Sequence, residues 1–219
     1  MKHRMTRLGG FTLSALVVLG VSACSLAYED VTVQKNGKTL DVTGVIDADT
    51  VETISAALAD SPEITTLRLV NVPGSADDEA SLNALAALVK DNNLATRVPA
   101  NGLVASGGTD MAVMSKNRVI EKGACVGVHS WAIGNLFGFD SGADLPRSDE
   151  AHDLYLDFYE TVNVPASFYW FTLEAASPEG MHWMSAKEIN RFNLSKVRLD
   201  ETPTETAAER EARCNALVF

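Results

Sequence analysis

The segment that decides the fold runs from Val104 to Trp131 and reads VASGGTDMAVMSKNRVIEKGACVGVHSW. Within it, Ser106 stands among small residues at the start of an apolar helical run. His129 ends a short strand-like run of valine and glycine. A serine that opens a helix and a histidine that ends a later strand have a structural reason to meet at one edge of a sheet.

The residues around Ser106 suit nucleophilic chemistry. Gly107 and Gly108 leave room for a substrate backbone beside the hydroxyl, and a helix that begins there directs free N–H groups toward it. A serine hydroxyl needs a base to take its proton, and the usual pKa range of histidine makes His129 suitable. The same residues are also typical of a helix N-cap and of a core histidine, so the pattern by itself leaves both interpretations open.

The hydrophobic pattern elsewhere alternates between strands and helices. A hairpin is predicted around Asn36-Gly37, and Asp49 with Glu52 is predicted to cap the next helix. The expected strands are 40–46, 66–70, 94–98, 118–120, 126–129 and 197–199, and the expected helices are 77–90, 149–162, 165–176 and 186–192, with a loop at 137–147 and a helix or tail at 204–217. This alternation indicates an α/β fold with a largely parallel sheet.

The composition is that of an ordinary globular protein. The chain has 219 residues, of which 46% are hydrophobic and 21% are charged, which suits one domain with or without a tail. Its net charge of −11 argues against a basic surface for nucleic acid. The sequence contains no Cys/His ligand set and no phosphate-binding glycine loop, so neither a metal nor a cofactor is expected.

Residues 1–23 are typical of an export signal. Basic residues precede an apolar run at 11–21 that is short for a membrane span. The run ends in Val-Ser-Ala-Cys, which resembles a bacterial lipobox and predicts a lipid anchor on Cys24 in the periplasm; simple cleavage after Ala23 is the alternative. Either cleavage removes Lys2, Arg4 and Arg7 and changes the net charge from −11 to −14. In a Gram-negative cell, Ser25 would suit sorting to the outer membrane.

The two remaining cysteines leave two possibilities open. In an oxidising compartment Cys125 and Cys214 can pair and tie the C-terminal helix to the core; two free thiols, with Cys125 buried, are the alternative. Asp110 lies one turn after Ser106 and is interpreted as a solvated or capping acid, with a place in the groove beside Ser106 as the alternative. His152 is interpreted as part of a solvated helix face. The aromatic run at 168–171 must place one face in the core, and the other face suits a peptide groove or a subunit contact in a homo-oligomer.

The order of the motifs resembles the Clp protease proteolytic subunit and its crotonase-fold relatives, especially small exported Clp-like proteins. The resemblance covers about 42–197 and rests on five short stretches. These are Gly44-Val45-Ile46, the strand and loop at 67–75, Ala105-Ser106-Gly107-Gly108, the strand pair at 118–129, and Met184-Ser185-Ala186-Lys187-Glu188. It implies repeated ββα units, and a division into a hairpin segment at 24–41, a domain at 42–199 and a C-terminal helix or tail at 200–219.

The resemblance also implies roles for individual residues. Ser106 would be the nucleophile and His129 the base, and backbone N–H groups around Gly74, Ser75 and Gly107 would form the oxyanion hole. The chain departs from the family where Ser75 replaces a second glycine, since a positive φ there would strain a serine. No acid matches the third member of the triad, for which Glu179 from a shifted loop is the candidate.

We therefore expect an exported serine hydrolase, peptidase-like, that uses a Ser–His dyad or incomplete triad on a peptide or protein substrate. No segment resembles the parts that dock an ATP-driven unfoldase, so ATP dependence is not expected. A catalytically silent envelope lipoprotein that binds peptides or partner proteins is the alternative. A crotonase-like acyl-thioester enzyme is a third hypothesis, weakened by the lack of coenzyme A outside the cytoplasm.

Overall fold

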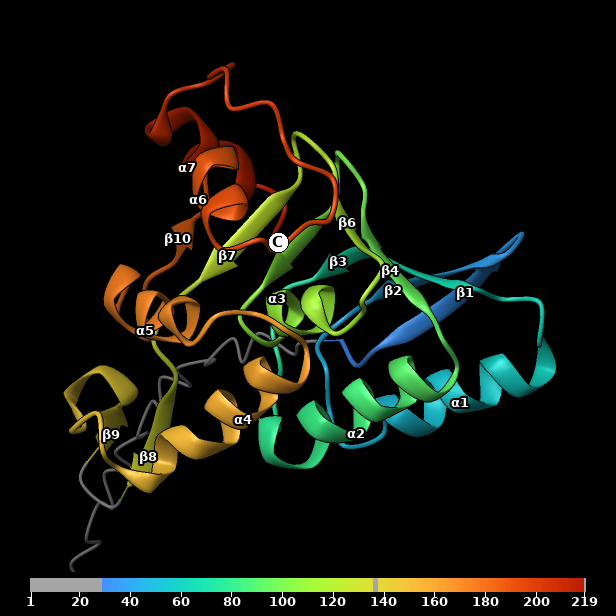
Figure 1. Cartoon of the computed structure of the whole chain (residues 1–219), viewed down its shortest axis with the longest axis horizontal. Helices are drawn as coiled ribbons and strands as arrows, with labels where there is room; N and C mark the ends of the chain where they lie inside the picture. The colour runs from blue at the N-terminus through green and yellow to red at the C-terminus, as the bar shows by residue number, and fades with distance from the viewer. Residues whose placement is uncertain (1–28, 136–137, 219) are drawn as a thin grey trace, which may run out of the picture.

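The computed structural model describes residues 29–135 and 138–218 (Figure 1). The predicted signal segment and Cys24 lie outside the described residues. Within the part of the chain that is described, no helix has the length and apolar character needed to cross a membrane.

The chain begins with the predicted hairpin, which belongs to the main sheet. Strands β1 (Thr32–Asn36) and β2 (Thr39–Thr43) are antiparallel, and Gly37 takes a φ of 63° in the turn between them. β2 then pairs in parallel with β3 (Thr66–Val72). The domain boundary expected between 41 and 42 therefore falls inside a strand of the sheet.

The sheet divides into two branches at β3. The first half of β3 pairs with β4 (Ala95–Val98), and its last residues pair with β5 (Leu103–Ala105). β4 continues to β6 (Arg118–Ile120), and β5 continues to β7 (Cys125–Val128). All these pairings are parallel, whereas the short β10 (His182–Trp183) joins β7 antiparallel. The fold class predicted from the sequence, a mostly parallel sheet with flanking helices, is confirmed.

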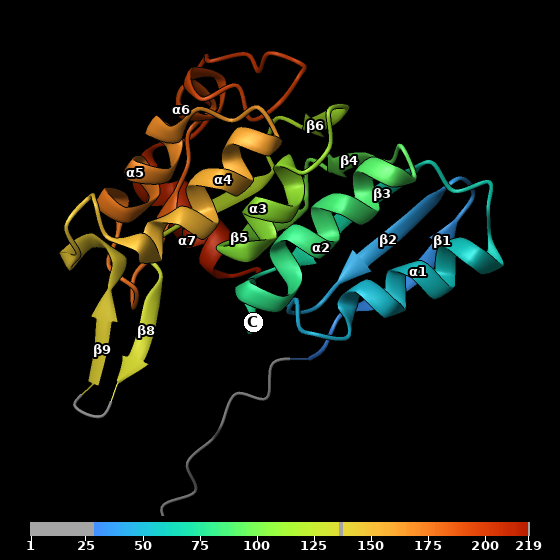
Figure 2. The ribbon, with the colours of Figure 1, turned by 60° about the horizontal axis from the view of Figure 1, so that its bottom comes forward.

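Helices cover the sheet and enclose its main apolar core, while a second, smaller cluster surrounds Cys125 and Cys214. They are α1 (Thr50–Asp60), α2 (Asp78–Asp91), α3 (Gly107–Val113), α4 (Asp153–Thr161), α5 (Ala166–Ala175), α6 (Ala186–Arg191) and α7 (Ala207–Asn215). Figures 1 and 2 show α1 and α2 side by side against the sheet. Leu67 and Leu69 from β3 are fully buried, as is Leu85 from α2, because alternate residues of the strand face the helices.

Three local predictions were wrong. Asp49 makes no capping bond, because the Asp47 carboxylate and the Thr50 hydroxyl bond to each other at 2.7 Å instead. Part of the expected loop at 137–147 belongs to a hairpin of β8 (Ala132–Asn135) and β9 (Gly138–Ser141), which extends from the body in Figure 2. Residues 197–199 form no strand, since the side chain of Asn190 takes both backbone hydrogen bonds of Leu199.

Arg118 on β6 is a fully buried cation that joins the ends of several elements. Its guanidinium donates to the carbonyls of Val113, Ser115, Val162, Asn163 and Asn193. These carbonyls lie at or just beyond the C-terminal ends of α3, α4 and α6, where helix dipoles are negative. Burial lowers the pKa of Arg118; the carbonyls therefore supply the stabilisation that a carboxylate would otherwise provide.

Candidate active site

Ser106 lies in a sharp turn between β5 and α3. Its backbone has φ 52° and ψ −128°, a conformation that glycine favours and that costs another residue roughly 1–3 kcal/mol. Its N–H donates to the Gly127 carbonyl at 3.1 Å, and its carbonyl accepts from Thr109 at 2.8 Å. A strained strand-to-helix turn of this kind presents a serine hydroxyl to the outside of the turn. The sequence pattern located this serine but did not reveal its strain.

The two glycines after Ser106 are required by close packing. A Cβ at Gly108 would lie 1.9 Å from the Val72 carbonyl oxygen, so no side chain fits between α3 and the end of β3. A Cβ at Gly107 would lie 2.4 Å from the Cβ of Ser75. These contacts hold the serine turn against the loop that follows β3.

That loop places one backbone nitrogen beside the serine turn. The Gly74 carbonyl accepts a hydrogen bond from the Ile46 N–H at 3.0 Å, and the Ala76 N–H donates to the Ile46 carbonyl at 2.7 Å. Backbone groups alternate in direction along an extended chain, so the N–H of Ser75 points to the opposite side, where its nitrogen lies 3.2 Å from a Cβ built on Gly107. Gly74 and Ser75 both have negative φ, so the serine at 75 introduces no backbone strain. The backbones of Ser75 and Gly107 lie next to each other.

His129 directly follows β7 and lines the same recesses as Ser106. Burial lowers its pKa, with a partial offset from the Ser130 carbonyl and the charge of Asp78. The imidazole is therefore neutral near pH 7 and can accept a proton. Its Nδ1 is buried and lacks a hydrogen-bond partner of good geometry among the described residues. No hydrogen bond joins its ring to the Ser106 hydroxyl in the described structure.

An open cleft of about 710 Å³ lies on one side of this pair. Five of the predicted site residues line it, namely Gly74, Ser75, Ser106, His129 and Glu179, whereas Gly107 does not. Glu179 is exposed on this lining and makes no hydrogen bond to His129 within the described chain. The structure thus brings Glu179 to the cleft but not to the histidine, where a third triad member would orient the ring.

A second, narrower recess of about 30 Å³ lies between Ser106 and helices α2, α4 and α5. Asp110 is 7% exposed and bonds to the Tyr159 hydroxyl, while the Tyr155 hydroxyl donates to Asp78 at 2.7 Å. Burial and the nearby Asp78 raise the pKa of Asp110 to about 7. The prediction of a solvated Asp110 was therefore wrong, and the alternative, a place in the groove beside Ser106, is what the structure shows. A charged residue one turn after Ser106, within an apolar run, was the available signal.

The prediction of a solvated His152 was also wrong, because this residue packs among the aromatic residues behind the recess. His152 is fully buried rather than solvated, because its Nδ1 bonds to the Tyr169 hydroxyl at 2.6 Å and its Nε2 to the Pro146 carbonyl at 3.1 Å. The indole N–H of Trp131 donates to the same hydroxyl at 2.9 Å. This network fixes the aromatic wall of the recess.

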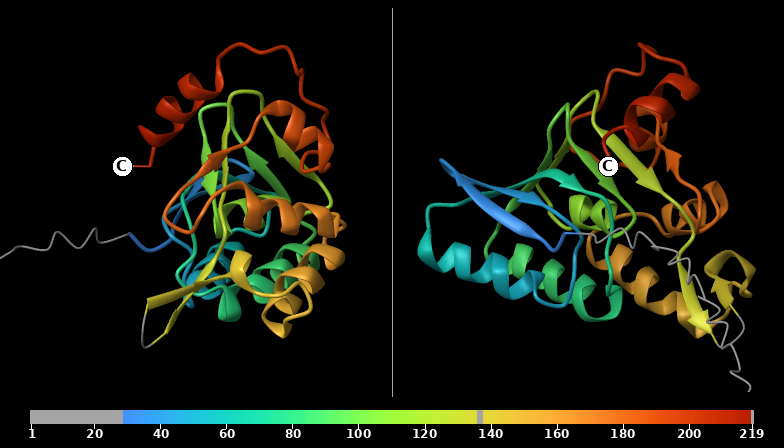
Figure 3. Two further views of the ribbon diagram at one scale, coloured as in Figure 1. Left: turned by 90° about the vertical axis from the view of Figure 1, so that its left-hand side faces the viewer. Right: turned by 180° about the vertical axis from the view of Figure 1, so that it is seen from behind.

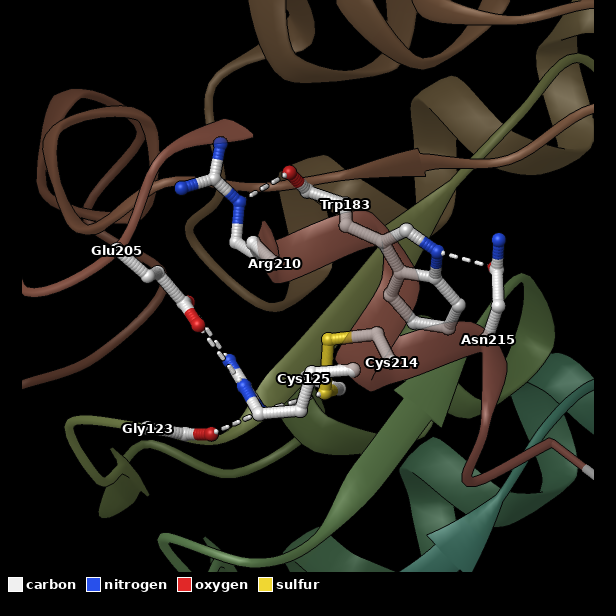
Figure 4. The surroundings of a disulfide bond; sticks show 8 residues. Gly123, Cys125, Trp183, Glu205, Arg210, Cys214 and Asn215 are labelled. Atoms are coloured by element: carbon white, nitrogen blue, oxygen red, sulfur yellow. Dashed lines mark hydrogen bonds and ion pairs between the residues drawn. A yellow bond between two sulfur atoms is a disulfide. The ribbon is translucent and has the colours of Figure 1, made fainter. Parts of the chain in front are cut away.

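The C-terminal helix forms part of the open cleft. Cys214 of α7 is bonded to Cys125 of β7, and Trp183 donates to Asn215 at 2.8 Å (Figure 4). Figure 3 shows α7 against the same end of the sheet as β7 and β10. The side of α7 that carries Glu211 and Asn215 lines the cleft. Of the two alternatives for the C-terminal segment, the structure thus shows the helix, and α7 forms one wall of the site.

The described residues contain no cluster of three or more histidine, cysteine or acidic side chains suited to a metal ion. Ser106, His129 and the acidic side chains of Asp78 and Asp110 line the recesses described above. A hydroxyl, an imidazole and carboxyl groups are the side chains that proton transfer and nucleophilic attack require.

Comparison with known proteins supports the fold. No protein-family model matches the chain, and no curated protein matches its sequence. A solved structure of the 1510-N membrane-bound stomatin-specific protease is similar over 72% of this chain and 76% of its own, with a TM-score of 0.53 and 13% identity. A solved structure of an enoyl-CoA hydratase from Polaromonas sp. JS666 is similar over 87% of this chain and 77% of its own, with a TM-score of 0.43 and 13% identity. At such identities likeness shows the fold alone, and the chain has the Clp protease and crotonase fold that its motifs predicted.

Proposed function

We propose that this protein is a serine hydrolase of the peptidase type, with Ser106 as nucleophile and His129 as general base. The observation that carries the proposal is the strained turn that presents Ser106 at the cleft that His129 also lines. The fold shared with a stomatin-specific protease agrees with this activity.

In the proposed reaction, the Ser106 oxygen attacks the carbonyl carbon of the scissile amide. Its proton passes to the free ring nitrogen of His129, which then protonates the leaving amine. The acyl-enzyme is hydrolysed by a water molecule that His129 deprotonates in turn. The N–H groups of Ser75 and Gly107 stabilise the negative oxygen of each tetrahedral intermediate, and each such donor contributes about 3 kcal/mol in related sites.

The proposed catalytic unit is a dyad. No carboxylate bonds to the buried Nδ1 of His129 among the described residues. A missing orienting acid costs up to about 10⁴-fold in rate in complete triads. We therefore expect slow turnover. Acylation of Ser106 should still be faster than uncatalysed hydrolysis of the same amide in water, because the oxyanion donors stabilise the transition state.

A fluorophosphonate probe tests the proposal directly. Wild type is expected to be labelled at Ser106, whereas Ser106→Ala is not labelled and His129→Ala is labelled much more slowly. Ser177→Ala removes an exposed serine near the cleft and serves as the matched control. Unchanged labelling of Ser106→Ala, or no labelling of folded wild type, contradicts the hydrolase.

The second candidate is a catalytically silent protein that binds peptides in the same cleft. The absence of a partner for His129 Nδ1 in the described structure favours it. In that case the probe labels nothing, while peptides still bind to wild type and to Ser106→Ala equally well.

We further propose that the protein is exported and anchored in the envelope through a lipid on Cys24. Support comes from the residues of the N-terminal segment alone. Cys24→Ser is expected to move the protein from the membrane fraction to the soluble periplasmic fraction. An unchanged membrane fraction contradicts the anchor.

A further inference from the structure

We propose that the narrow recess beside Ser106 selects a cationic substrate side chain, with lysine preferred, so that the protein acts on basic peptides. This inference rests on the proposed function, because it names the substrate class of the same site. It concerns residues that the sequence motifs did not identify, chiefly Asp78 and Asp110.

The first observation is the sign of the charges around Ser106. Asp78 and Asp110 line the narrow recess, and Glu179 and Glu211 line the open cleft. No lysine or arginine lines either space within the described residues. A cleft lined by one sign of charge attracts and orients substrate groups of the other sign.

The second observation is an unmatched acceptor in the recess. The Oδ1 atom of Asp78 is buried and has no hydrogen-bond partner in the described structure, while its Oδ2 accepts from Tyr155. Asp110 is similarly held through one oxygen by the Tyr159 hydroxyl. A buried carboxylate oxygen without a donor is costly. An ammonium group brings three donors and the opposite charge, and therefore satisfies the unmatched oxygen of Asp78.

The size and walls of the recess favour lysine over arginine. A volume of about 30 Å³ accommodates one or two groups the size of a water molecule, which suits an ammonium better than a planar guanidinium or an aromatic ring. Trp131 and Tyr155 stack with ring centroids 5.8 Å apart, and Tyr155 and Tyr169 at 5.5 Å. These rings line the recess, so the ammonium group and the last methylene group of a lysine side chain would contact aromatic carbon there.

The closing experiment compares acetyl-Ala-Ala-X aminocoumarin amides in which X is lysine, arginine, norleucine or glutamate. For wild type, kcat/KM for lysine is expected to exceed that for norleucine by about tenfold or more, with arginine between them and glutamate lowest. Asp78→Asn and Asp110→Asn are expected to reduce the lysine-to-norleucine ratio toward one. Asp91→Asn removes the same charge at the exposed far end of α2 and is expected to keep the wild-type ratio.

Binding to Ser106→Ala separates this inference from the hydrolase proposal. Titration calorimetry with the same four peptides is expected to show the lysine preference without catalysis. If Ser106→Ala binds the lysine peptide preferentially but wild type cleaves none, the hydrolase fails and the recess assignment stands. The recess assignment is overturned if wild type cleaves the lysine and norleucine peptides at equal rates, or if Ser106→Ala binds these two peptides equally well. This comparison needs no recess variant, so it holds even where an asparagine substitution prevents folding.

Discussion

Cys125 and Cys214 form a disulfide that joins the strand leading to His129 to the helix that closes the opposite side of the cleft. The bond lies beside the Trp183–Asn215 hydrogen bond and the Arg210 contact to the Trp183 carbonyl (Figure 4). Arg213 adds bonds to Glu205 and to the Gly123 carbonyl. The last helix is therefore fixed to the sheet by one covalent and several polar contacts.

Loss of this disulfide is expected to destabilise the protein strongly. The bond closes a loop with a sequence separation of 89 residues, and in the chain-entropy picture a loop of that size contributes about 4–5 kcal/mol. Urea unfolding of the Cys125→Ser/Cys214→Ser double variant should show this loss against oxidised wild type. Reduced wild type is the control and should match the variant; equal stability of variant and oxidised wild type would contradict the prediction.

The backbone strain at Ser106 predicts that a glycine there stabilises the fold. Ser106→Gly relieves the positive φ, whereas Ser106→Ala keeps it and also removes the hydroxyl. After the entropy cost of glycine in the unfolded chain, we expect Ser106→Gly to be more stable than Ser106→Ala by about 1 kcal/mol. Chemical denaturation of both variants measures this difference. A less stable glycine variant would show that the turn is not strained.

The buried Asp110 predicts a stability that falls as pH rises. Its pKa is about 7 in the folded protein, against an ordinary value of 3.8. Between these values the unfolded chain has released the proton and the folded protein still holds it, so raising the pH favours unfolding. The shift corresponds to roughly 4 kcal/mol, lost between about pH 4 and pH 7. Asp78, Tyr155 and Tyr159 surround the group.

Asp110→Asn should remove this pH dependence, because the asparagine oxygen still accepts from Tyr159 but does not ionise. The measurement is the free energy of unfolding from pH 4 to pH 8, with the exposed Asp91→Asn as control. The same slope in wild type and Asp110→Asn would contradict the assignment.

Arg118 is expected to be essential for stability and not for chemistry. Arg118→Met removes the donor to five buried or partly buried carbonyls, and unsatisfied carbonyls of this kind together cost roughly 3–5 kcal/mol. Thermal unfolding measures the loss, and Lys122→Met on the exposed turn nearby is the matched control. If Arg118→Met is as stable as the control variant, the carbonyl cluster has another source of stabilisation.

The sequence predicted the main elements well because their signals are local. Alternating strands and helices follow from hydrophobic periodicity, and the small residues beside Ser106 mark a turn. The contact that requires a glycine at 108 comes from Val72, which is distant in sequence. The prediction failed where a side chain replaced a backbone partner, as Asn190 does for Leu199. It also failed for Asp110 and His152, since burial of a polar group depends on distant partners such as Tyr159 and Tyr169.

The sequence by itself determined the order of most strands and helices and the positions of Ser106 and His129 along that order, because hydrophobic periodicity and turn residues act over a few neighbouring residues. Only the tertiary structure decided what surrounds the pair. The acids of the recess come from α2 and α3, the tyrosines from α4 and α5, and one wall of the cleft from α7. Their proximity depends on how the helices pack on a branched sheet, which no local pattern in the chain encodes.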